Sequence, residues 1–124
     1  MSNLGIQYSY QASMGKHGAG ELLQGTLPLL ILRILFKGPN HGFAIARRIE
    51  AVSNDVLRAE EGSLYPALHK MELEGWIESA WGLTENNGKA KYYRLTRLGH
   101  KQLKAETERW NAISGAIAAI LLEA

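Results

Sequence analysis

A chain of 124 residues in which 46% are of apolar types can bury one hydrophobic core, and its formal net charge of +2 by itself selects no class of partner. The absence of cysteine excludes disulfides, thiol catalysis and zinc sites with cysteine ligands. No apolar run reaches the roughly 18 residues of a membrane span, and the N-terminus lacks a signal-peptide pattern, so we expect a cytoplasmic protein that does not enter the membrane.

The N-terminal part of the chain divides into a tail and a first helix. Residues 1–19 show no periodic apolar pattern, and we interpret them as a flexible tail without an assigned role. Residues 22–36 are rich in Leu and Ile and are followed by a Gly-Pro pair, which predicts a buried helix. Pro28 leaves two alternatives: the helix begins near Thr26 with Pro28 in its first turn, or a longer helix from Glu21 bends at Pro28.

Two further helices are predicted in the middle of the chain. Asn40 is a suitable N-cap for a helix over residues 41–53, and the short segment 56–58 could form a minimal strand. The third helix begins at residue 62 or 63, and Gly75 ends it after Glu74. Its apolar residues share one face at the helical period: Leu64, Ala67, Leu68 and Met71.

A β-hairpin and a long helix complete the predicted order of elements. Residues 76–84 and 90–96 are rich in strand-forming types, and the polar segment 85–89 between them has the composition of a turn. Thr96 can cap a last helix that runs to about Leu122.

The second and third helices predict a helix-turn-helix. A major groove about 12 Å wide accepts a helix whose outer face is small and polar. The outer face of the third helix meets this condition, although Glu60, Glu61 and Glu72 are acidic exceptions. We expect it to contact DNA through Ser63, Tyr65, Pro66, His69 and Lys70.

Positive charge gathers in and after the hairpin. Six of the fourteen Lys and Arg residues lie between Lys89 and Lys104, and no Asp or Glu occurs in residues 86–105. Alone, this stretch fits a solvated helix face as well as a nucleic-acid contact. Since the hairpin would project toward a neighbouring phosphate backbone, we favour DNA. The expected contacts are Asn86, Asn87, Lys89 and Lys91, to which we add Arg94 and, from the second helix, His41.

These residues resemble the PadR family of bacterial transcriptional regulators, from about Leu22 to Leu121. The motifs that carry the resemblance are Gly25-Thr26-Leu27, Gly38-Pro39 followed by His41-Gly42-Phe43, Glu61-Gly62-Ser63-Leu64-Tyr65-Pro66-Ala67-Leu68, Gly75-Trp76-Ile77, Trp81-Gly82 and Lys91-Tyr92-Tyr93-Arg94-Leu95-Thr96 with Gly99. The resemblance implies a recognition helix over Ser63–Lys70, a wing over Asn86–Lys91, a dimer with a single C-terminal helix, and repression rather than activation. Phe43 departs from the Tyr common in the family, and Leu73 from a position that is often polar.

The last helix predicts a homodimer. At roughly 1.5 Å per residue it is about 39 Å long, more than so small a domain can cover. Its apolar residues repeat in steps of seven, three and four, the spacing of coiled-coil packing. We expect the dimer interface at Leu103, Trp110, Ile113, Ile117, Ile120 and Leu121. Trp110 leaves two alternatives: a packed interface tryptophan, which we favour, or a platform on which a small aromatic effector stacks.

Taken together, the sequence predicts a mainly α protein with a small β-hairpin: a winged helix-turn-helix over residues 20–96 and a dimerisation helix over residues 97–124. The four His residues lack metal-ligand spacing, so we expect no catalytic residues, no metal and no cofactor. The expected function is a repressor that binds an inverted-repeat operator as a homodimer. The alternative is a winged helix that only binds protein, which predicts an apolar or acidic outer face on the third helix.

Overall fold

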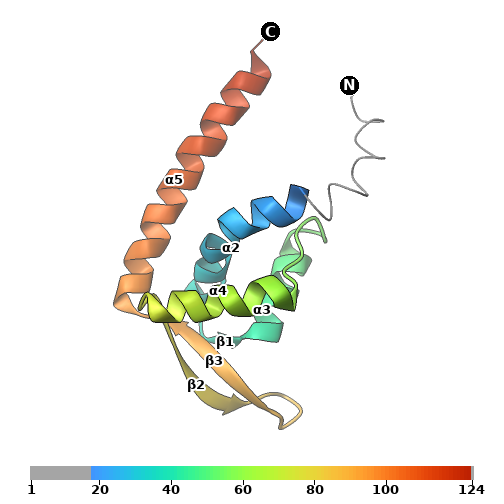
Figure 1. Cartoon of the computed structure of the whole chain (residues 1–124), viewed down its shortest axis with the longest axis vertical. Helices are drawn as coiled ribbons and strands as arrows, with labels where there is room; N and C mark the ends of the chain where they lie inside the picture. The colour runs from blue at the N-terminus through green and yellow to red at the C-terminus, as the bar shows by residue number, and fades with distance from the viewer. Residues whose placement is uncertain (1–17, 124) are drawn as a thin grey trace.

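The structure, a computed structural model, describes residues 18–123, with side chains described from residue 25 onward. In chain order the elements are α2 (Gly18–Phe36), β1 (Asn40–His41), α3 (Gly42–Val52), α4 (Glu61–Leu73), β2 (Ile77–Leu83), β3 (Lys89–Leu95) and α5 (Arg97–Leu122) (Figure 1). The prediction of a mainly α protein with a small β-hairpin and a long last helix is confirmed.

The helix α2 runs without interruption through Pro28, so the longer of the two alternatives for the first helix is correct. Proline lacks the N–H of the helical ladder and its ring crowds the carbonyl one turn earlier, which bends a helix. Figure 1 shows the two halves of α2 pointing in different directions. The predicted tail, residues 1–19, lies outside the described residues except for its last two, which start α2.

The first strand is Asn40–His41, and the prediction of a strand at residues 56–58 is wrong. Asn40 pairs with Tyr93 and His41 with Tyr92 in antiparallel register. The sheet order is β1-β3-β2, so both edges of the central strand β3 are occupied and residues 56–58 have no edge of it to join.

Because the chain enters α3 from a strand, the helix begins one residue later than predicted. His41, not Asn40, is the N-cap, and its Nδ1 accepts a hydrogen bond from the backbone N–H of Ala44 at 3.3 Å. On α3, Ile45 and Ile49 are buried, whereas Val52 at the end of the helix is exposed.

The remaining boundaries agree closely with the sequence. Gly75 stops α4 with φ of +82°, a left-handed conformation that favours glycine. The hairpin pairs Ile77–Leu83 with Lys89–Leu95. The Thr96 hydroxyl accepts a hydrogen bond from the Gly99 N–H at 3.0 Å, which confirms the predicted cap of α5.

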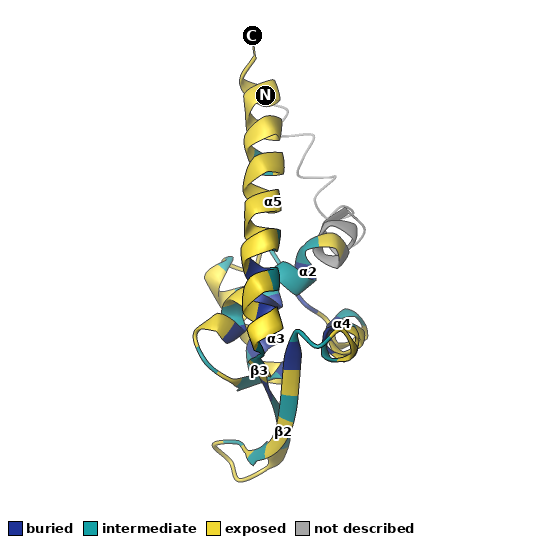
Figure 2. Cartoon of the chain, turned by 90° about the vertical axis from the view of Figure 1, so that its left-hand side faces the viewer, coloured by how far each residue is buried: buried dark blue, intermediate teal, exposed yellow. Residues whose placement is uncertain are grey.

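One hydrophobic core joins α2, α3, α4, the hairpin and the start of α5. Its fully buried side chains are Leu27, Ile31, Leu32, Ile45, Leu64, Leu68, Met71 and Ile77. Leu103 of α5 also belongs to this core, which separates it from the other five residues predicted for the dimer interface. Beyond Leu103 nearly every residue of α5 is exposed (Figure 2).

Candidate nucleic-acid interface

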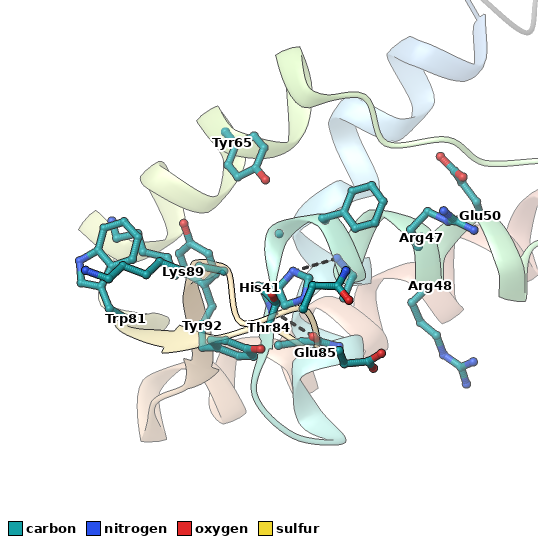
Figure 3. A pocket seen from close by; sticks show the side chains of 18 of the residues that line it. His41, Arg47, Arg48, Glu50, Tyr65, Trp81, Thr84, Glu85, Lys89 and Tyr92 are labelled. Atoms are coloured by element: carbon teal, nitrogen blue, oxygen red, sulfur yellow. Dashed lines mark hydrogen bonds between the residues drawn. The ribbon is translucent and has the colours of Figure 1, made fainter.

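A groove of about 1300 Å³ lies between α3, α4 and the hairpin. Figure 3 shows Tyr65 on α4 facing His41 across it, with Trp81 and Lys89 toward one end and Arg47 and Arg48 toward the other. Three separate segments of the chain therefore contribute to one concave surface.

The outer face of α4 is open to solvent, as the sequence predicts. Tyr65, Pro66, His69 and Lys70 are exposed and Ser63 is half-buried. Of these five residues, Tyr65 and His69 line the groove. An added Cβ at Gly42 would lie 2.7 Å from the Tyr65 hydroxyl oxygen, so the glycine at the start of α3 allows the Tyr65 ring to pack closely against it.

Hairpin residues form the opposite wall. Asn86, Lys89 and Lys91 line the groove, whereas Asn87 is exposed at the hairpin turn with φ of +63°. His41 lies at the base, where its ring packs edge-on against Tyr92 at a centroid distance of 5.2 Å. Since His41 also caps α3, it has a structural role whether or not it touches a ligand.

Two cations of the predicted basic stretch are bound to carboxylates. The Lys91 ammonium lies 3.9 Å from a carboxylate oxygen of Glu72. The Arg94 guanidinium donates from Nε and from a terminal nitrogen to Glu78, both at 2.6 Å. Arg94 does not line the groove, and its carboxylate partner belongs to the neighbouring strand. The acid-free run in residues 86–105 thus overstates the free positive charge of the surface.

Two residues of α3 that were not among the predicted DNA contacts, Arg47 and Arg48, also line the groove. The Arg47 guanidinium lies 5.7 Å from the ring centroid of the exposed Phe43, one helical turn earlier. The sequence contains no local pattern that groups these two arginines of α3 with the hairpin. For Arg47 alone, the i, i+4 spacing from Phe43 was an available signal in the sequence.

Four carboxylates also line the groove: Glu50, Asp55, Glu72 and Glu85. The lining is therefore mixed in charge, with cations at both ends. Among the described residues no group of three or more His, Cys, Asp or Glu side chains could hold a metal ion. In residues 18–123 no helix combines the length and apolarity needed to cross a membrane.

The buried Tyr93 beside the groove makes stability depend on alkaline pH. Burial raises its pKa above the ordinary value of 10.0, and the charges of Glu72 and Tyr65 raise it further. The unfolded chain therefore ionises at this residue at lower pH than the folded one. The contribution of Tyr93 to the free energy of unfolding is therefore fully present below about pH 10, and it is lost as pH rises through the raised pKa. We expect urea denaturation between pH 9 and 11.5 to show a smaller loss for Tyr93→Phe than for wild type, and equal losses would contradict this assignment.

A second exposed surface is the apolar side of α5. Trp110, Ile113 and Ile117 expose 40%, 47% and 51% of their surface, and Ile120 and Leu121 expose more. All five belong to the part of α5 beyond Leu103, which Figure 2 shows as exposed over nearly its whole length. A stripe of large apolar side chains on an otherwise well-packed domain is characteristic of a protein interface.

Comparison with known proteins identifies relatives over most of the chain. The sequence profile of the transcriptional regulator PadR-like family matches residues 31–105, which cover α3, α4, the hairpin and the start of α5. A protein X of Lysinibacillus sphaericus, which is uncharacterized, is 29% identical over 97 residues, covering 78% of this chain and 89% of its own.

Solved structures agree with the sequence matches. A transcriptional regulator from Clostridium thermocellum superposes with a TM-score of 0.73 at 28% identity, over 80% of this chain and 96% of that one. A PadR-like transcriptional regulator from Bacillus cereus superposes with a TM-score of 0.73 at 27% identity, over 84% of this chain and 99% of that one.

Proposed function

The chain belongs to the PadR-like family of transcriptional regulators, which are DNA-binding proteins and not enzymes, and from this premise we propose that it represses transcription by binding an inverted-repeat operator as a homodimer. We assign DNA binding to the winged helix-turn-helix over residues 20–96 and dimerisation to residues 97–124. A repressor of this kind would act in the cytoplasm, beside its operator.

The observation that carries the DNA-binding assignment is the open outer face of α4. Tyr65 and His69 lie exposed on it and line a groove whose ends hold Lys89, Arg47 and Arg48. In this arrangement α4 would enter the major groove while the cations at both ends meet the phosphates that flank it. We propose that the DNA contact also includes Ser63, Pro66, Lys70, Asn86 and Asn87. The surface that makes this contact would be supported by His41, Lys91 and Arg94.

The exposed side of α5 supports the dimer. A second copy of the chain that packs against Trp110, Ile113 and Ile117 would cover apolar surface that the single chain leaves in water. Two-fold symmetry would then present two α4 helices to successive turns of an inverted repeat. Packing in this interface is the role we favour for Trp110. If an effector releases the repressor, a small aromatic molecule stacked on Trp110 is the ligand this side chain would take.

The test is the salt dependence of binding to the promoter region of the protein's own gene. Affinity should fall steeply as salt rises, because each phosphate neutralised by Lys or Arg releases bound counterions. Lys89, which forms no ion pair within the described part of the chain, should be one such contact. We expect Lys89→Gln to weaken binding to every sequence about three- to tenfold and to lower the salt slope by about 0.9 per protomer.

The matched control is Lys101→Gln, which removes the same charge from the exposed surface of α5, outside the groove. Fluorescence anisotropy with a labelled duplex from 50 to 300 mM salt measures both quantities. Weak binding that does not change with salt would reject the repressor and favour a winged helix that binds only protein. Normal binding by Lys89→Gln would reject the hairpin as a DNA contact.

A further inference from the structure

Glu72 is the point where the recognition helix meets both strands of the hairpin. One of its carboxylate oxygens accepts a hydrogen bond from the Ser79 hydroxyl of β2 at 2.6 Å. The other lies 3.9 Å from the Lys91 ammonium of β3. Glu72 is also close enough to Tyr93 to raise the pKa of its hydroxyl. A single side chain of α4 therefore contacts β2 and acts on two residues of β3.

This contact changes the charge that the hairpin presents to the groove. Lys89 and Lys91 lie two residues apart, so both side chains are on the same face of β3, and both line the groove. Lys91 has a carboxylate beside it, whereas within residues 18–123 no ion pair involves Lys89. The side chains are 44% exposed for Lys91 and 32% for Glu72, so water screens much of their attraction and the pair restrains Lys91 modestly rather than rigidly.

We propose that Glu72 is a positioning residue that holds Lys91 away from phosphates and so limits affinity for DNA of arbitrary sequence. This inference rests on the DNA binding proposed above. Binding without sequence preference depends almost entirely on the number of phosphates neutralised. A cation held by an acid of its own chain releases fewer counterions from DNA. The carboxylate also places a negative charge in the groove that every duplex must approach.

Glu72→Gln tests the proposal, because the amide oxygen still accepts the Ser79 hydroxyl while the charge that holds Lys91 is lost. The measurement is anisotropy of a labelled 20-base-pair duplex of random sequence across a salt series. We expect affinity at low salt to rise about three- to tenfold and the salt slope to steepen by up to about 0.9 per protomer. In the Lys91→Gln background, the steeper slope should disappear.

Two control variants separate charge from shape. Glu74→Gln removes the same charge from an exposed residue just past α4, outside the groove, and should leave binding and slope near wild type. Ser79→Ala removes the hydrogen bond but keeps the carboxylate, and should not increase affinity. The proposal is overturned if Glu72→Gln weakens binding, if it matches Glu74→Gln, or if its steeper slope persists without Lys91.

A comparison of lysines keeps the proposal testable even if Glu72→Gln does not fold. Because Glu72 already compensates Lys91, Lys91→Gln should lose less affinity for random duplex than Lys89→Gln. An equal or larger loss would overturn the proposal. If wild type itself shows no salt-dependent binding, the proposed function fails instead, so the two failures give different results.

Discussion

Glutamates in place of Ile113 and Ile117 are expected to make the protein monomeric and to lower its affinity for an inverted-repeat operator roughly 10²- to 10⁴-fold. Both side chains lie half exposed in the apolar stripe of α5. Across a two-fold interface the double variant would introduce four carboxylates without partners, and an unpaired charge is costly to bury. Without dimerisation the second half-site is no longer bound intramolecularly, which accounts for the size of the loss.

Ala119→Glu is the matched control, since at about 100° per residue it lies on the side of α5 opposite Ile117. It should remain dimeric and bind the operator normally. Light scattering after size exclusion gives the mass in solution, and circular dichroism checks that the variants stay folded. A dimer that survives both glutamates would show that the proposed interface lies elsewhere.

Replacing Gly99 by Ala is expected to destabilise the protein by about 3 kcal/mol, within the upper range for overpacked sites. A Cβ added at Gly99 would lie 2.0 Å from the carbonyl oxygen of Trp76. That oxygen accepts the backbone N–H of Thr96 at 3.1 Å, so the carbonyl cannot move without disturbing the residue that caps α5. For a domain of this size the melting temperature should fall by about 10–20 °C.

Gly115→Ala tests the same substitution later in α5, where a new Cβ would meet no described atom within 4 Å. There alanine should be neutral or stabilising by up to about 1 kcal/mol, because glycine is the poorer helix former. Thermal melts of the two variants at equal protein concentration give the comparison. A Gly99→Ala protein that melts within 3 °C of wild type would show that the junction between the hairpin and α5 adjusts more easily than its geometry indicates.

The elements that the sequence determined by itself are those set by neighbouring residues. The stop at Gly75, the cap at Thr96 and the hairpin turn depend on contacts a few residues apart, and each was predicted within a residue or two. The open face of α4 was also predicted, because apolar residues at the helical period mark the buried side and leave the other side to solvent.

Tertiary structure alone decided the features that join distant parts of the chain. The strand Asn40–His41 exists because β3, about fifty residues later, offers it an edge, and two residues are too few to show a strand pattern. The carboxylates that bind Lys91 and Arg94 lie outside the acid-free segment, so a local charge count could not find them. Leu103 has the spacing of the dimer stripe but packs into its own core, since the period of a helix fixes which residues share a face and not what covers that face.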